Sequence, residues 1–225
     1  MRTNHLFKIL IAMLFITVSS TAQVSLFYQN GKAGYKNTVT GEVVVTAHYT
    51  AASNMIQLPS GDYYALVFEG TKAGYINDKG EVIIPLIYDD ASVFSDGMAR
   101  VKMGGKYGFI NLQGKTVIPF DYNLAGDFVN GMARVEQGGK WGFIDIKGRT
   151  AIAIEYYNAG DFSEGVAPVM TETGSWGFIN AQGTFVIKPA YIKAESFKNG
   201  EALVHNGEKF IFIDLSGKVL RDLSR

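Results

Sequence analysis

The chain has 225 residues and equal numbers of basic and acidic side chains, 21 Lys and Arg against 21 Asp and Glu, so its formal net charge at pH 7 is zero. This balance removes the usual electrostatic reason to expect a nucleic acid or an anionic membrane surface as a partner. The length suffices for one domain with a substantial core. Its 26 Gly, 12 Tyr and 15 Phe favour strands and tight turns over helices.

Residues 1–22 have the pattern of a cleaved export signal. A positively charged start precedes the apolar run ILIAMLFITV, which is too short to span a bilayer, and small residues then precede Gln23. The alternative for this run is a single buried strand or helix. We expect an exported chain of residues 23–225, periplasmic or extracellular in a bacterium, with no membrane span after cleavage. Because the sequence has no Cys, the exported chain has no disulfide.

A tandem repeat extends over the exported chain, and one glycine marks its period. We call these residues the repeat glycines: Gly34, Gly74, Gly108, Gly142 and Gly177. Ile211 stands at the sixth equivalent place, and Ile, Tyr, Phe, Ala and Val recur at constant distances from the marker. The units cover approximately residues 24–58, 59–92, 93–126, 127–160, 161–195 and 196–225.

Each unit is predicted to form three short strands. In the fourth unit these are residues 132–136 (MARVE), 140–145 (KWGFID) and 150–154 (TAIAI). Gly-Gly or Asn-Gly (as at Asn206) fits a tight hairpin turn between the first two strands, and DIKG, which ends at Gly148, fits a type I turn closed by a glycine bulge. A helical repeat of similar period would need apolar residues three and four apart, whereas these segments alternate.

The repeat glycine calls for a physical reason, because a bare glycine in mid-strand weakens the strand. In the second strand of the fourth unit, Trp141 and Phe143 point to one face while Gly142 and Ile144 point to the other. Both faces are therefore apolar, and we expect each unit to be covered by a neighbour on both sides. We predict that an aromatic ring of the next unit lies over Gly142.

These patterns predict an all-β fold, a tandem-repeat stack of six three-stranded β-meanders that forms an open, curved solenoid. A closed six-bladed β-propeller is the alternative. Propeller blades typically have four strands. Closure also often uses a blade shared by both chain ends, and this sequence shows no such sharing.

The run GKWGFID, followed further on by DFSEGVAPV, resembles the WG repeat, also known as the KWG repeat. The similarity covers roughly residues 24–220 in six units. It implies a bacterial, mostly β-structured and frequently exported protein, and it implies no common activity. The sequence departs from the pattern near both ends, where Ala33 and Ala73 replace the aromatic residue and Phe210 and Ile211 replace Trp-Gly. Such departures are expected where a terminal unit has one exposed side.

No motif for catalysis or metal binding stands out. Residues 114–116 (GKT) resemble the end of a phosphate-binding loop, but the spacing to the preceding glycine is wrong and a strand follows. His48 and His205 lie in different units without a neighbouring ligand. We therefore predict no cofactor and no metal site.

Acidic residues offer no clear catalytic pair either. Asp89 and Asp90 form the densest acidic group, which we interpret as a solvated loop face. A pair of carboxylates for glycoside hydrolysis does not stand out from Asp127, Asp161 and Glu164, which occupy repeated positions. We therefore predict no catalytic residues.

Binding residues are expected where the repeat is broken, because units share scaffold residues while binding residues vary. The recurring aromatic rows are interpreted as core. The better candidates are the inserted segment of residues 50–64 (TAASNMIQLPSGDYY), Tyr157, His205 and Met170. No ligand-binding residue is assigned. We expect a non-enzymatic binding or scaffold protein whose partner is an unknown protein or glycan. The alternatives are a hydrolase of envelope or extracellular polymer and a purely structural envelope component.

Overall fold

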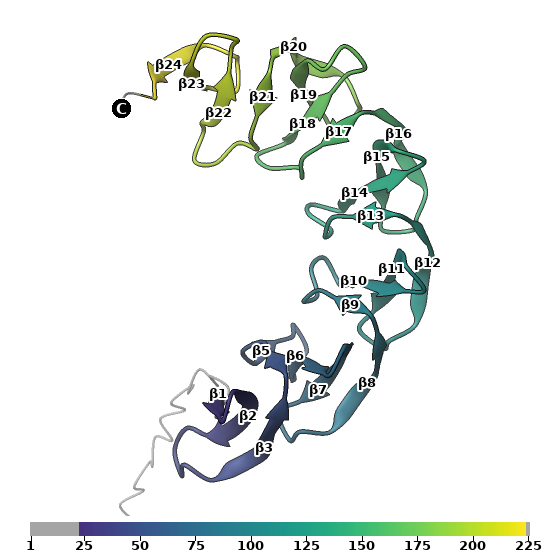
Figure 1. Cartoon of the computed structure of the whole chain (residues 1–225), viewed down its shortest axis with the longest axis vertical. Coiled ribbons are helices and arrows are strands. Elements are labelled where there is room, and N and C mark those ends of the chain that lie inside the picture. The colour runs from purple at the N-terminus through teal and green to yellow at the C-terminus, as the bar shows by residue number, and fades with distance from the viewer. Residues whose placement is uncertain (1–22, 224–225) are drawn as a thin grey trace, which may run out of the picture.

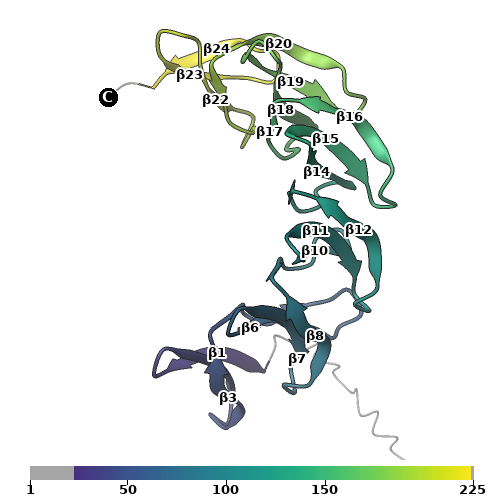
Figure 2. The ribbon, with the colours of Figure 1, turned by 45° about the vertical axis from the view of Figure 1, so that its right-hand side comes forward.

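The computed structural model describes residues 23–223, which fold into six antiparallel sheets placed one after another along an arc (Figure 1). Strands and turns account for this part of the chain, and it contains no helix. The two ends of the arc stay apart in both views (Figures 1 and 2), so the architecture is the open stack and not the closed propeller. The export signal predicted for residues 1–22 lies outside the described residues.

The sheets follow the chain order. The first sheet contains β1 (Val24–Gln29), β2 (Lys32–Asn37) and β3 (Val43–Tyr49). The second contains β4 (Ala51–Ala52), β5 (Ile56–Gln57), β6 (Tyr63–Glu69), β7 (Lys72–Asn77) and β8 (Val82–Tyr88). The third contains β9 (Asp90–Ala91), β10 (Met98–Met103), β11 (Lys106–Asn111) and β12 (Thr116–Tyr122).

The remaining three sheets repeat the pattern of the third. The fourth contains β13 (Leu124–Ala125), β14 (Met132–Gln137), β15 (Lys140–Asp145) and β16 (Thr150–Tyr156). The fifth contains β17 (Asn158–Ala159), β18 (Val166–Met170), β19 (Trp176–Asn180) and β20 (Phe185–Tyr191). The sixth contains β21 (Lys193–Ala194), β22 (Ala202–His205), β23 (Phe210–Ile213) and β24 (Val219–Asp222).

Every sheet after the first has a short strand that the sequence did not predict, so the three-stranded meander gains a fourth strand, and in the second sheet β5 is a fifth. These strands (β4, β9, β13, β17 and β21) have two residues each, end in Ala, and line the concave side of the arc (Figure 1). The chain enters each of them directly from the long third strand of the preceding sheet. A crossover therefore ends one sheet and begins the next, which ties neighbouring sheets together covalently.

The predicted second turn is present in the structure. In the fourth sheet, Gly148 adopts a φ of 76° and its N–H donates to the carbonyl of Asp145 at 2.8 Å. The Asp145 carboxylate also accepts the N–H groups of Lys147 and Arg149, both at 2.9 Å. In the sixth sheet, however, the first turn is not the expected two-residue Asn-Gly turn. It is a four-residue loop in which the N–H of Asn206 bonds the carbonyl of the last loop residue at 3.1 Å.

The hydrophobic core lies between adjacent sheets rather than within one. Neighbours on β15, Phe143 and Ile144, are 1% and 0% exposed on opposite faces of the fourth sheet. Phe143 packs toward the fifth sheet, with Phe162 at 4.8 Å between ring centroids, and Ile144 packs toward Phe109 of the third. This confirms that a unit is covered on both sides. Burying one such ring stabilises the stack by roughly 1.5–3 kcal/mol.

Glycine is required at the repeat position for a different reason from the one predicted. The prediction that an aromatic ring of the next unit lies over Gly142 is wrong. A Cβ at Gly142 would lie 2.6 Å from the carbonyl oxygen of Ala153 and 2.7 Å from the Cα of Ile154, both on β16 of the same sheet. The register between β15 and β16 shifts at this point, so that β16 bulges over Gly142. In the sixth sheet, Ile211 and Phe212 pair with Asp222 and Arg221 in one register, so the shift comes only after Phe212 and a side chain fits at Ile211.

The neighbouring unit does rest on a glycine, but it is the turn glycine. A Cβ at Gly148 would lie 3.1 Å from Cγ1 of Ile118 in the preceding sheet. Gly80 stands in the same relation to Val45, and Gly114 to Ile84. Two requirements therefore coincide at this position, a positive φ and close approach by the unit before it.

Replacing Gly142 by Ala tests the bulge. We expect Gly142→Ala to lower the free energy of unfolding by about 1–3 kcal/mol, because backbone atoms of β16 must shift to admit the methyl group. Thermal unfolding measures the effect. The matched control is Gly139→Asn, at a turn glycine with φ of 79° and open space around it, where Asn should cost less than about 0.5 kcal/mol. Equal melting temperatures for the two variants would contradict the explanation.

Candidate functional site

The inserted segment, residues 50–64, forms a small hairpin at the concave edge of the second sheet (Figure 1). β5 turns back on β6, with Ile56 paired to Tyr64. The turn is closed by the N–H of Leu58 donating to the carbonyl of Asp62 at 2.8 Å, and Gly61 supplies a positive φ of 94°. In the later sheets a two-residue turn, such as Asp96–Gly97, stands in place of this hairpin. The insertion is therefore an ordered extension of one repeated turn.

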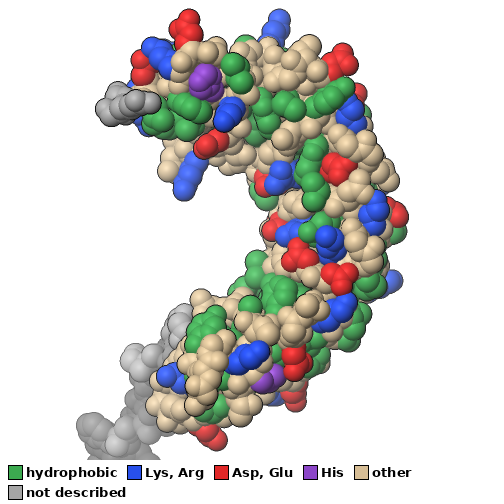
Figure 3. Space-filling view, in the orientation of Figure 1, with side chains coloured by type: hydrophobic (Ala, Val, Ile, Leu, Met, Phe, Trp, Pro, Cys, Tyr) green, Lys and Arg blue, Asp and Glu red, His purple; other side chains and the backbone are tan. Residues whose placement is uncertain are grey.

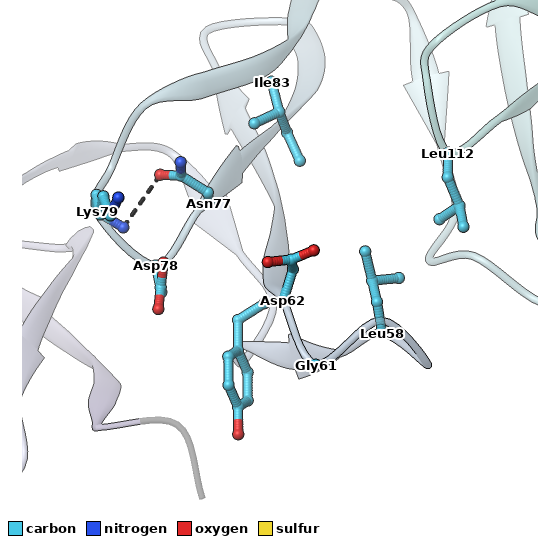
Figure 4. A pocket seen from close by; sticks show the side chains of 9 residues that line it. Leu58, Gly61, Asp62, Asn77, Asp78, Lys79, Ile83 and Leu112 are labelled. Carbon is cyan, nitrogen blue, oxygen red and sulfur yellow. Dashed lines mark hydrogen bonds between the residues drawn. The ribbon is translucent and has the colours of Figure 1, made fainter. Parts of the chain in front are cut away.

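The hairpin forms one wall of a hollow of about 480 Å³. Its opposite wall is the turn between β7 and β8, residues 77–79, together with Ile83 of β8, and Leu112 of the third sheet closes the side. Figure 4 shows Leu58 and Leu112 facing one another across this hollow, with the carboxylate of Asp62 directed between the walls. The hollow thus combines the apolar side chains of Leu58, Ile83 and Leu112 with polar groups such as Asp62.

A second hollow, of about 280 Å³, adjoins the first. It lies between the hairpin and the third sheet, and Leu58 and Leu112 line both hollows. Phe94 and the Asp96–Gly97 turn form its far side. Figure 3 shows hydrophobic side chains gathered on the concave side of the arc where its lower arm meets its middle. We call the two hollows together the insertion groove.

Buried aromatic residues make the base of the insertion groove rigid. Tyr75 packs against Phe94 at 5.0 Å between ring centroids, and Tyr64 packs edge-on against the same ring at 5.3 Å. The Tyr75 hydroxyl donates to the carbonyl of Ser92 at 2.6 Å, and the Tyr64 hydroxyl accepts the N–H of Phe94 at 2.9 Å. Burial raises the pKa of the Tyr75 phenol far above its ordinary value.

The charged residues around the groove are mostly acidic. Asp62, Asp78 and Asp96 line it, against a single cation, Lys79. Asp62 accepts a hydrogen bond from the hydroxyl of Ser60 at 2.8 Å, which orients its carboxylate. The groove therefore offers carboxylate acceptors beside leucine side chains, a combination suited to hydroxyl or amino groups carried on an apolar frame.

Two of the other sequence candidates lie together, away from the insertion groove. Tyr157 is 45% exposed, and its main-chain N–H donates to the carbonyl of Met170 at 2.8 Å. The Lys140 ammonium lies 2.9 Å from the centroid of the Tyr157 ring. Both aromatic and ammonium line a shallow hollow of about 350 Å³ at the fourth and fifth sheets. Met170 pairs with Asn158 of β17 within the fifth sheet.

The two candidate histidines belong to the first and last sheets and do not meet. His48 lies against Tyr49, and its Nδ1 is 2.8 Å from the carbonyl of Thr46. His205 lies edge-on to Phe210 and accepts the N–H of Gly207 at 3.1 Å. Within the part of the chain that the structure describes, no group of three His, Cys, Asp or Glu side chains could hold a metal ion.

The acidic residues singled out in the sequence are engaged in ion pairs and hydrogen bonds. Asp89 forms an ion pair with Lys72 at 2.6 Å, and the hydrogen bond from this ammonium holds the pKa of the carboxyl below its usual range. Asp90 is paired with Arg100, which also reaches Asp127 of the next unit at 3.1 Å. Asp89 is exposed and Asp90 half-buried, so the interpretation as a solvated loop face holds for Asp89, while Asp90 lies in β9 and bridges to a cation.

The remaining two acidic candidates also bridge neighbouring units. Arg134 lies 2.7 Å from Asp161 of the next sheet and covers the ring of Trp141. Glu164 accepts the N–H of Gly200 at 2.9 Å. These carboxylates pair with cations or accept hydrogen bonds from turns of a neighbouring sheet.

Sequence reasoning identified the insertion but missed what faces it. Leu112 occupies the second position of a repeated turn, where Gly114 and the Asn111 side chain fix the backbone. A leucine at an exposed turn is a usable signal, because turns are usually polar. The contribution of residues 77–79 gave no signal, since it depends on how two sheets are placed.

Among residues 23–223 the structure contains no helix with the length and apolar character of a membrane span. The sequence profile of the "WG containing repeat" matches residues 74–107, 107–141, 141–172 and 176–210. No curated protein matches the chain.

Solved structures share the fold at low sequence identity. The chain is similar to the computationally designed Ika8 protein, at 11% identity over 89% of this chain and 71% of that one, with a TM-score of 0.52. It is similar to a eukaryotic initiation factor, at 10% identity over 90% of this chain and 63% of that one, with a TM-score of 0.58. It is also similar to Hsv2 of Kluyveromyces lactis with loop 6CD replaced, at 7% identity over 87% of this chain and 75% of that one, with a TM-score of 0.51. These are propeller-like β-repeat folds, and the likeness concerns the fold alone.

The buried phenol of Tyr75 predicts a loss of stability in alkali. Because its pKa in the folded chain lies above the ordinary value of about 10, its contribution is complete below pH 10 and is lost as the pH rises further. Tyr75→Phe should lower the free energy of unfolding by about 1 kcal/mol at pH 8, through the lost hydrogen bond, and by less at pH 11, where the unfolded form of the native chain gains stability by ionising Tyr75. Denaturant unfolding at both pH values measures this convergence. Tyr157→Phe is the exposed control, and a difference for Tyr75→Phe that does not change with pH would contradict the prediction.

Proposed function

This chain belongs to the WG containing repeat family, and we propose that it is an exported, non-enzymatic binding or scaffold protein that presents its concave surface to a protein or glycan partner. The export signal predicted for residues 1–22 supports the location. The near-identical construction of the central sheets supports a scaffold role, since a regular stack supplies an extended curved surface.

The observation that carries the proposal is the insertion groove. The longest insertion into the repeat is residues 50–64, and there the chain builds two adjoining hollows instead of a disordered loop. Insertions in repeat proteins often lie on the binding face. The rigid base that Phe94, Tyr64 and Tyr75 form keeps the groove open without a ligand, and this lowers the entropic cost of binding.

The chemistry of the groove defines the partner in general terms. Leu58, Ile83 and Leu112 favour an apolar side chain or the apolar face of a sugar ring. Asp62 and Asp78 favour hydroxyl or amino groups next to it. A glycan chain and an extended peptide with a basic residue both have this combination. The groove opens to solvent, so a part of a long partner can enter while the rest follows the arc.

The disposition of the acidic residues favours binding over hydrolysis. The carboxylates of Asp90, Asp127 and Asp161 are engaged with Arg100 and Arg134 between sheets. A hydrolase would need one carboxyl group free to protonate a leaving group and another free to act as nucleophile or base. We therefore place polymer hydrolysis second.

Removing the groove while keeping the stack tests the proposal. In one variant, residues 54–63 are replaced by VFSDG, the five residues at positions 93–97 that form the ordinary turn in the third sheet. In a second, Leu112→Asp places a charge at the ridge between the two hollows. The control is Ile146→Asp, at the same turn position one unit later and 46% exposed.

We expect the native chain and Ile146→Asp to capture the same partner from an envelope fraction, and the two groove variants to lose it. With the identified partner, calorimetry should show binding at least about tenfold weaker for Leu112→Asp. Equal capture by all four proteins would contradict the site. Cleavage of envelope polymer by the native chain, with no partner captured, would favour the hydrolase.

A further inference from the structure

We infer that the free edge of β1 is an acceptor for an extended segment of a partner protein, which would complete the first sheet as the short strands complete the other five. This site is separate from the insertion groove, and the inference does not depend on the function proposed for it.

The five later sheets show how the place is filled. In the third sheet, the crossover lays β9 beside β10, and Ala91 pairs with Val101. The N–H of Asp89 donates to the carbonyl of Lys102 at 2.8 Å, and the N–H of Ser92 donates to the carbonyl of Arg100 at 2.9 Å. Equivalent pairs of bonds hold β4, β13, β17 and β21. The receiving strand thus offers two carbonyls that are two residues apart, and these accept hydrogen bonds from two N–H groups that are three residues apart in the crossover.

Among residues 23–223, the first sheet has the receiving strand and no short strand beside it. Its order is β1-β2-β3, with β1 at the concave edge. Phe27 pairs with Gly34 as Val101 pairs with Gly108, so Leu26 and Tyr28 take the places of Arg100 and Lys102. Their carbonyl and N–H groups accordingly point away from β2. Tyr28 is 60% exposed.

The edge of β1 also lacks the protection that the other exposed edges have. Its six residues, VSLFYQ, pair with β2 without interruption and include neither proline nor charge. The outer strands β3, β8, β12, β16, β20 and β24 are each distorted by a register shift against their neighbour, and β8, β12 and β20 also carry a proline. Proteins usually protect sheet edges with such features, because an open, regular edge pairs with other chains. Because the outer strands of this chain are protected and the edge of β1 is not, we infer that the edge of β1 pairs with another chain.

The filled sheets also indicate what the occupant looks like. All five short strands end in alanine, and this residue stands beside the Val position that Phe27 holds in β1. The occupant is therefore an extended segment of another protein, with a small residue at its centre and free N–H groups at both ends, and it binds by strand addition. Stacking of a second copy against the sixth sheet is disfavoured, because Arg221 lies over Phe212 there and is paired with Glu201.

The chain's own crossover supplies a defined probe. The peptide YYNAGDF, residues 156–162, forms β17 in the fifth sheet, where the N–H groups of Tyr157 and Gly160 donate to β18. Added to the full chain, it should slow amide hydrogen exchange at Tyr28 by about tenfold or more at saturation, because Met170, the equivalent of Tyr28 in β18, pairs with Asn158 of β17. The same peptide methylated at the nitrogens of Tyr157 and Gly160 should have no effect.

A pair of variants at one position provides the control on the protein side. Tyr28→Pro removes an outward N–H and places a ring on the edge, while the ladder between β1 and β2 keeps its bonds. Tyr28→Val keeps the N–H and loses only the aromatic ring. Binding of the peptide, followed by calorimetry, should persist in Tyr28→Val and be lost in Tyr28→Pro, with unchanged circular dichroism in both.

Three results would overturn the inference. One is the absence of protection by YYNAGDF, or equal protection by its methylated form. Another is protection at Tyr28 without peptide that disappears on dilution together with a dimer, which would assign the edge to a second copy. The third is such protection that disappears when residues 1–22 are removed, which would assign it to the chain's own beginning.

Discussion

Each interior sheet of this protein is apolar on both faces, so no interior sheet can be shielded from water without a neighbour on each side. Phe143 and Ile144, adjacent on β15, express this constraint in two residues, because they are buried against the fifth and the third sheet respectively. The stack is therefore stabilised mainly by contacts between units, as in other linear repeat proteins. The ion pairs that join Arg100 and Arg134 to the next unit follow the same interfaces.

The ends of the stack show how the constraint is relieved. In the sixth sheet, where a seventh unit would place a phenylalanine, the guanidinium of Arg221 covers Phe212 at 4.0 Å from the ring centroid. In the first sheet, Ser25 and Lys36 replace the buried Ala and Ile of later units on the outward face. Both outer faces are thus made compatible with water. The edge of β1 has not been modified in this way, and it is there that we place strand addition.

The binding site that we propose lies where the regular construction is interrupted. The repeated turn between the short strand and the next is minimal in four sheets and extended in the second, and only there does it enclose the insertion groove. The groove depends on the stack in turn. Leu112 reaches it from the third sheet, and Phe94, held by the crossover, supports Tyr64 and Tyr75 beneath it. A binding surface assembled from two adjacent units stays rigid because the units cannot separate without exposing their core.

The sequence by itself determined the repeat, its β-structure, the Asp145–Gly148 type of turn, the coverage of both faces and the position of the insertion. These are local properties, since alternation, turn residues and period are read within one unit. Only the tertiary structure decided why Gly142 is bare, because the bulge of β16 is a register shift that no residue pattern announces. It also decided the short fourth strand, the partners of Asp89 and Asp90, and the residues that face the insertion. Each of these depends on the distance between segments far apart in the chain, which is set by how sheets stack and not by the preferences of the residues themselves.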